Sequence, residues 1–215
     1  MIDILTKIQA YAEENPVSIS WRSVSHPFNL WPSLQDVEKW DTQPDLKLKR
    51  FTMWHTFAEQ LSVLGVKSLV DVGTASGQFV LCCLQAGIEQ VYGIDPQHYY
   101  LYSNESDFTE SAYNAKDHLF LGDVEAFMEI IKSTKDFQID CISILNFFHG
   151  GDWYGRDLKL LETINGKTKY LVTSDPINPN TLKYLYDNYD PIYHYKQTAR
   201  YEDHFIFKSK HTTNG

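Results

Sequence analysis

The sequence contains few cysteines, and their spacing suggests neither metal binding nor a disulfide framework. Its 215 residues include three, Cys82, Cys83 and Cys141, of which two are adjacent. There is no Cys-x-x-Cys pair, and no cysteine stands at metal-ligand spacing from a histidine. Such a set is typical of small buried side chains in a reducing compartment. We therefore expect no metal site and a cytoplasmic location.

A basic excess and a long apolar run are also missing. The formal net charge is −9, whereas nucleic-acid binders carry a basic stripe that neutralises phosphates. The one dense basic run, Lys47, Lys49 and Arg50, falls in a helical pattern and is predicted to be a solvated helix face. No apolar run approaches the ~20 residues of a membrane span, and the N-terminus does not resemble a secretion signal. Nucleic acid and membrane are therefore disfavoured as partners.

The first 65 residues are predicted to form two helices separated by an irregular stretch. Residues 2–14 place apolar side chains on one helical face, and Pro16 ends that helix. After an irregular stretch, an apolar pattern from Phe51 to Leu64 predicts a second helix, which Gly65 stops. We interpret residues 1–65 as a helical N-terminal cap or lid on a domain formed by residues 66–215.

From residue 67 onward, strand and helix patterns alternate. Strands are predicted at 67–72, 90–94, 118–121, 138–145, 168–174, 191–197 and 203–208, with helices near 77–86, 103–114, 123–133, 156–165 and 179–188. Near-continuous apolar runs such as LVDV and CISIL suit strands buried on both faces of a parallel sheet. The last two strands are joined by ARYED, too short for a crossover helix, so they should pair antiparallel. The fold class is therefore α/β, a three-layer sandwich with a seven-stranded, mostly parallel sheet and an antiparallel C-terminal hairpin.

A glycine-spaced turn follows the first of these strands. Gly73 and Gly77 flank Thr-Ala-Ser at the carboxyl end of the strand, where open α/β sheets bind ligands. Asp71 precedes the turn, and Asp95 closes the second strand, where a carboxylate can accept both hydroxyls of a ribose. The spacing lacks the middle glycine of a dinucleotide fingerprint and the Gly-Lys-Ser/Thr of a phosphate loop. Asp71 would also suit a cationic ligand better than a pyrophosphate. The alternative is that both glycines serve only a tight turn.

The segment DVGTASG, followed one strand later by GID, resembles the Asp-x-Gly-x-x-x-Gly signature of class I S-adenosylmethionine-dependent methyltransferases. The resemblance extends in element order over about residues 67–208, and it implies a Rossmann-like domain with S-adenosylmethionine as cofactor. It implies that the turn contacts the methionine part, that Asp95 binds the ribose, and that LGDVEAF contacts the adenine. The implied cofactor-binding residues are Asp71, Gly73, Thr74, Ala75, Gly77, Asp95, Pro96, Asp123, Val124, Asn146 and Phe147. Asp123 is also a good helix N-cap, and it can have either role or both.

The segment NFFHGGDWYGRD, after the fourth strand, occupies the reactive position of that family. His149 is the candidate general base, because an imidazole titrates near neutral pH, and Asp152 is a weaker candidate. Alternatively, His149 is simply an exposed loop residue. Asn-Phe-Phe-His lacks both prolines of the Asn/Asp-Pro-Pro-Tyr/Phe pattern that resembles nucleic-acid and protein amide N-methyltransferases. Together with the negative charge, this argues against a base-flipping enzyme and favours a small-molecule acceptor, with a hydroxyl as the methylated group.

Other interpretations remain open from the sequence. Four aromatic side chains of the N-terminal segment could form a lid over the acceptor or pack on the sheet edge: Trp21, Phe28, Trp31 and Trp40. Arg22 and His26, in the same loop, could contact an anionic acceptor. The chain could be a non-catalytic domain that binds cofactor or a protein. A nicotinamide-dependent oxidoreductase is disfavoured by the missing glycine and the absence of a Tyr-x-x-x-Lys relay at Tyr92, Tyr113 or Tyr184. The sequence identifies neither the acceptor nor the oligomeric state.

Overall fold

The computed structural model describes residues 1–15, 44–74, 77–95, 115–145, 155–174, 178–196 and 203–211. In the helix that begins at residue 44, side chains are described from Thr52 onward. The predicted helix 103–114 and the N-terminal residues Trp21, Arg22, His26, Phe28, Trp31 and Trp40 lie outside the described residues.

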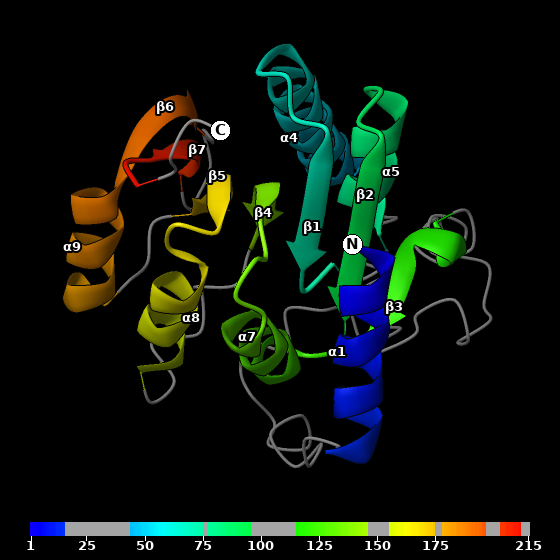
Figure 1. The fold of residues 1–215 in the computed structure, drawn as a ribbon. Coiled ribbons are helices and arrows are strands. Elements are labelled where there is room, and N and C mark those ends of the chain that lie inside the picture. Colours follow the sequence, from blue (N-terminus) through cyan, green and yellow to red (C-terminus); the bar gives the residue numbers. More distant parts are fainter. Residues whose placement is uncertain are drawn as a thin grey trace.

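The described strands form a seven-stranded sheet in the order β3-β2-β1-β4-β5-β7-β6 (Figure 1). In chain order they are β1 (Ser68–Val72), β2 (Gln90–Asp95), β3 (Leu119–Leu121), β4 (Ile139–Ser143), β5 (Thr168–Ser174), β6 (Tyr189–Tyr195) and β7 (His204–Ser209). The first five strands are mutually parallel, and β7 lies antiparallel between β5 and β6. The predicted mostly parallel sheet with an antiparallel C-terminal pair is confirmed.

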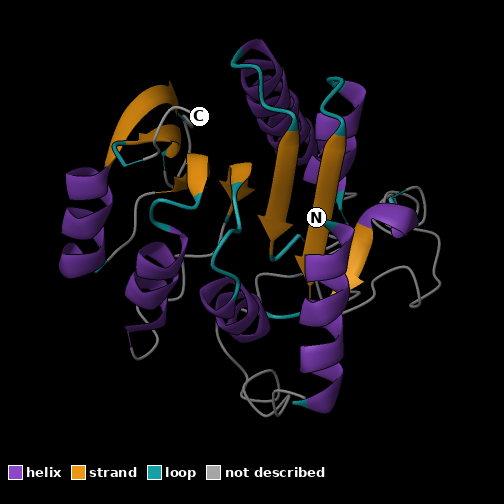
Figure 2. Ribbon diagram, in the orientation of Figure 1, coloured by secondary structure: helices purple, strands orange, loops and turns teal. Residues whose placement is uncertain are grey.

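Helices cover both faces of this sheet (Figures 1 and 2). On one face lie α4 (Pro44–Val63) and α5 (Gln78–Gln85); on the other lie α1 (Ile2–Glu14), α7 (Val124–Ser133), α8 (Arg156–Ile164) and α9 (Pro179–Asn188). A short 3₁₀ helix, η2 (Lys116–His118), precedes β3. The predicted three-layer sandwich is confirmed.

Alternating side chains of each strand enter two separate cores. In β1, Leu69 joins the core beneath α4 and α5, whereas Val70 and Val72 join the core beneath α1 and α7. Both N-terminal helices contribute to these cores: α1 through Leu5 and Ile8, and α4 through Met53, Trp54, Phe57, Ala58 and Leu61. The two helices therefore lie in the outer layers of the sandwich, on opposite faces of the sheet.

Two elements begin earlier than their sequence patterns predicted. Helix α4 starts at Pro44, before the apolar positions that begin at Phe51, and so includes the basic run Lys47, Lys49 and Arg50 that was predicted to be helical; proline suits the first turn of a helix. Strand β6 starts at Tyr189, directly after α9, and includes Pro191. Proline is tolerated there because β6 is an edge strand and its pairing with β7 is irregular between Pro191 and Tyr193.

Candidate functional site

The glycine turn after β1 is hydrogen-bonded to the end of β2. The backbone N–H groups of Gly73 and Thr74 both donate to the Ile94 carbonyl oxygen, at 2.9 and 3.1 Å, and Gly77 N–H donates to Thr74 O at 3.0 Å. Gly73 and Gly77 have φ values of 77° and 75°, which L side chains rarely adopt. The turn therefore requires both glycines for its own geometry, and its hydrogen bonds hold it next to Asp95.

The Thr74 side chain packs closely on β2, where Gly93 leaves space for it. A Cβ atom at Gly93 would lie 2.5 Å from Thr74 Cγ2 and 2.6 Å from Thr74 Oγ1, well inside van der Waals contact. The glycine of the GID segment thus allows the turn to approach the second strand. The sequence analysis did not assign a role to Gly93.

The ends of β2 and β3 are joined at Asp95 and Gly122. Gly122 N–H donates to the Asp95 carbonyl oxygen at 3.1 Å, and Asp123 follows as the N-cap of α7. The Asp123 carboxylate accepts from Ala126 N–H at 2.7 Å, which confirms the predicted cap. Val124 is buried in the core beneath α1 and α7. Asp95, Asp123 and the glycine turn therefore lie along one continuous edge of the sheet.

Asp71 is a buried carboxyl group beside this turn. Its side chain is 4% exposed and lies on the sheet face covered by α5, opposite Ser143 of β4. Burial raises the pKa of the Asp71 carboxyl to about 6, while the nearby hydroxyls of Ser143 and Thr74 act to lower it. Within the described part of the chain, neither hydroxyl makes a hydrogen bond of normal geometry, so they stabilise the carboxylate only weakly. A cation at this position would stabilise the carboxylate strongly.

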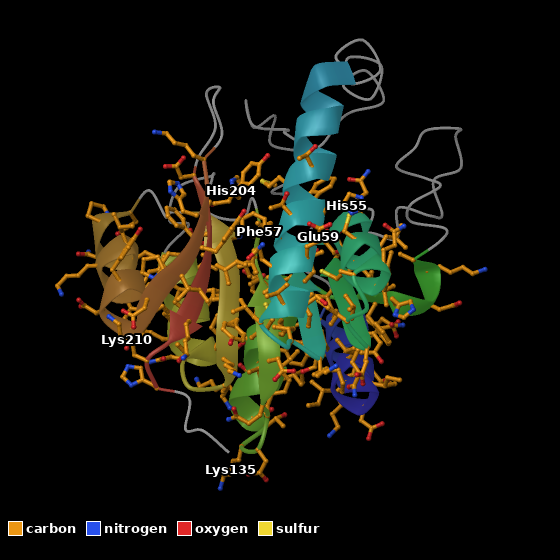
Figure 3. The ribbon with its side chains drawn as sticks, turned by 90° about the horizontal axis from the view of Figure 1, so that it is seen from above. His55, Phe57, Glu59, Lys135, His204 and Lys210 are labelled. Carbon is orange, nitrogen blue, oxygen red and sulfur yellow. The ribbon has the colours of Figure 1, made fainter. Side chains whose placement is uncertain are left out.

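Further polar side chains are buried at the same edge, and the sequence analysis missed them. Ser174 ends β5 and lies opposite His204, the first residue of β7, and both are buried. By strand alternation they lie on the face covered by α4, and Figure 3 labels His204 and Phe57 of α4. On this face Phe57 contacts the rings of Tyr193 and Tyr195. Ser143 interrupts the apolar run CISIL, and Ser174 follows Thr173 at the end of YLVTS, so a polar residue within or at the end of a buried strand could have identified them.

The remaining predicted site residues lie outside the described residues. These are Ala75, Pro96, Asn146, Phe147 and the candidate base His149. The described chain continues past Ser143 through Ile144 and Leu145, both of which are buried.

The described residues contain no candidate site for metal binding or for thiol chemistry. Among those residues, no group of three or more His, Cys, Asp and Glu side chains could hold a metal ion. All three cysteines are buried and free, as expected for packing residues. Over the same residues, no helix combines the length and apolar character needed to cross a membrane.

No protein-family model matches the chain, and no curated protein matches it by sequence. The fold, however, is similar to solved methyltransferases. Magnesium protoporphyrin IX methyltransferase (ChlM) from Synechocystis PCC 6803, with bound S-adenosylmethionine, aligns over 96% of this chain and 97% of its own, with a TM-score of 0.55 and 15% identity.

Two further structures are similar over part of the chain. N-methyltransferase NodS from Bradyrhizobium japonicum WM9 aligns over 72% of this chain and 93% of its own, with a TM-score of 0.50 and 13% identity. The bifunctional kinase-methyltransferase WbdD aligns over 80% of this chain at 18% identity and a TM-score of 0.50. The chain spans 43% of the length of WbdD. At these identities the likeness concerns the fold, which is the Rossmann-like fold of the class I S-adenosylmethionine-dependent methyltransferases.

Proposed function

We propose that this chain is a methyltransferase that binds S-adenosylmethionine along the carboxyl edge of its sheet and methylates a hydroxyl of a small-molecule acceptor. The observation that carries the proposal is the hydrogen-bonded series of the glycine turn, Asp95 and the Gly122–Asp123 turn. This series lies beside the β1–β4 boundary, where the order of the strands reverses. Open α/β sheets bind their ligands at such a boundary.

The residues of this edge fit the parts of the cofactor. The Asp95 carboxylate suits the two hydroxyls of a ribose, and the turn between Gly73 and Gly77 allows close approach by the methionine part. Asp123 and Val124 would lie next to the adenine. Asp71 lies near the turn, and its buried carboxyl favours a cationic group such as the amino group of the cofactor. Ala75, Pro96, Asn146 and Phe147 complete the proposed set.

When bound, the cofactor supplies a methyl group on a positively charged sulfur. The chain's own task is to align the acceptor oxygen with that methyl group and to exclude water. Transfer of the methyl group to the acceptor oxygen would leave the electron pair of the broken sulfur–carbon bond on sulfur. His149 accepts the proton that the acceptor hydroxyl loses, and later releases it to solvent. No metal takes part in this proposal.

A transfer assay tests the proposal. The protein is incubated with methyl-tritiated S-adenosylmethionine and the small-molecule fraction of a cell extract, and label is measured in the products. We expect protein-dependent labelling that is lost in Asp95→Ala. We expect His149→Gln to slow transfer by a factor of about 10² to 10⁴ near pH 7, with part of the loss recovered at higher pH.

His204→Gln is the matched control, because it removes a buried imidazole from the carboxyl edge of the sheet, at the first residue of β7. If His204→Gln abolished transfer and His149→Gln did not, the assignment of the base would be wrong. Binding of the cofactor without transfer to any acceptor would favour a non-catalytic methyltransferase-like domain instead.

A further inference from the structure

Helix α1 lies against the turn that joins β3 to α7. Gly122 occupies this turn, and a Cβ atom there would lie 2.7 Å from Cγ2 of Ile8. Ile8 is fully buried in the core that also contains Val124 and Phe127, the latter on the first turn of α7. Its β-branched side chain has one strongly preferred rotamer in a helix, so the methyl group cannot turn away freely. The backbone of the turn is therefore held at contact distance from α1.

The same turn carries Asp123 and is hydrogen-bonded to Asp95, two acidic residues of the candidate site. Gly122 N–H donates to the carbonyl oxygen of Asp95 at 3.1 Å, and Asp123 is the next residue in the chain. Apart from Ile8, the one described atom within 4 Å of the hypothetical Cβ is Cβ of Ile94, the residue before Asp95, at 3.8 Å. A displacement of α1 would thus reach Gly122 and, through it, both Asp95 and Asp123.

We propose that Ile8 is a positioning residue for cofactor binding: α1 fixes the place of the Gly122–Asp123 turn and so determines the affinity for the adenosine part of the cofactor. This inference rests on the proposed function. It gives the first helix of the chain a role in holding the cofactor, in addition to its contribution to the core. The sequence analysis interpreted residues 1–65 only as a helical cap or lid on the domain.

The test is Gly122→Ala, measured by calorimetric titration with S-adenosylhomocysteine and with adenosine. Gly122 has no positive φ, so alanine is compatible with its backbone and the substitution acts through the contact with Ile8. Because the turn must shift by several tenths of an ångström, we expect Kd to rise about tenfold for both ligands. Ile8→Ala removes the contacting methyl group, so the double variant should return to within about threefold of Ile8→Ala alone.

Leu5→Ala is the matched control. Leu5 is as buried as Ile8, in the same helix and the same core, but makes no contact within 4 Å of the Gly122 position. Both single alanine variants should lower the melting temperature, whereas only Ile8→Ala should raise Kd by several-fold. This pair of variants also tests the proposal if Gly122→Ala does not fold.

An unchanged Kd in Gly122→Ala, with a lower melting temperature, would overturn the proposal, because α1 would then serve stability alone. Equal effects of Leu5→Ala and Ile8→Ala on Kd would overturn it as well. Failure of the wild-type protein to bind S-adenosylhomocysteine would have a different meaning: it would remove the proposed function on which the inference rests.

Discussion

Asp71 and Ser143 lie opposite each other on β1 and β4, at the rung where both strands approach the carboxyl edge of the sheet. The carboxyl group is buried beside Cys83 of α5 and Cys141 of β4, and the pKa of both thiols is raised by burial and, to a lesser extent, by the charge of Asp71. An acid in such apolar surroundings is unfavourable for stability when it is ionised. Under the proposed function, a cationic group of the cofactor offsets this cost.

This position predicts how stability depends on pH. The Asp71 pKa is about 6 in the folded chain and 3.8 for an unperturbed aspartate, so the folded state binds the proton more tightly. The group's contribution to stability is therefore highest below pH 4, and it declines as pH rises through about 6. The total decline is about 3 kcal/mol, from roughly two pKa units at 1.36 kcal/mol each.

Asp71→Asn removes this titration while it preserves the shape of the side chain. We expect the variant to be more stable than wild type by up to about 3 kcal/mol at pH 8, with a much smaller difference at pH 4.5. Urea unfolding of the ligand-free protein at both pH values measures this. The same stability difference at the two pH values would contradict the assignment.

Asp123→Ser separates the two roles of Asp123. Serine is as good an N-cap as aspartate, so the stability of the protein should change by only a few tenths of a kcal/mol. Its shorter side chain cannot reach as far toward a bound adenine, and we expect Kd for S-adenosylhomocysteine to rise about tenfold. An unchanged Kd would mean that Asp123 is only the cap of α7. Asp123→Ala, which loses the cap, should cost about 1 kcal/mol of stability.

Asp140 lies at the amino edge of the sheet, opposite the proposed cofactor site, and tests whether a loss of stability there leaves cofactor binding unchanged. One of its carboxylate oxygens accepts from Lys67 N–H at 2.8 Å, Ser68 N–H at 3.0 Å and Ser68 Oγ at 3.2 Å, which joins the start of β1 to β4. Asp140→Ala should lower the free energy of unfolding by about 2–3 kcal/mol, because charged acceptors make the stronger hydrogen bonds.

The affinity of Asp140→Ala for S-adenosylhomocysteine should be unchanged, since the substitution lies at the amino edge. The exposed Asp136→Ala serves as control and should change stability by less than about 0.5 kcal/mol. Urea unfolding and calorimetric titration measure the two quantities. A loss of affinity in Asp140→Ala would show that substitutions in this sheet affect binding wherever they lie.

The fold was largely predictable from the sequence because its signals are local. Apolar runs gave the strands, Asp123 gave the start of α7, and the short ARYED connection gave the antiparallel pairing of β6 and β7. Each of these depends on residues close together in the chain. The apolar pattern did not specify the start of α4 at Pro44, because it begins only at Phe51, although the basic run before Phe51 was predicted to be helical.

The contacts between distant segments could not be predicted in this way. The pairing of Ser174 with His204 depends on β7 lying between β5 and β6, and the contact of Ile8 with Gly122 depends on the face on which α1 packs. Periodicity within one element does not specify either relationship. The glycine turn and Asp95 were recognisable by spacing, whereas the proximity of Asp71 to Ser143 required the order of the strands.

The most direct test of cofactor binding is a set of thermal melts with S-adenosylmethionine, S-adenosylhomocysteine, NAD and NADH. It compares wild type with Asp95→Ala, and uses the exposed Asp117→Ala as a control of equal charge. A ligand at 100 times its Kd stabilises the native state by about 2.7 kcal/mol. We predict that both adenosyl ligands raise the midpoint in wild type and Asp117→Ala but not in Asp95→Ala. No shift with these two ligands, or a shift with the nicotinamides alone, would contradict the proposed function.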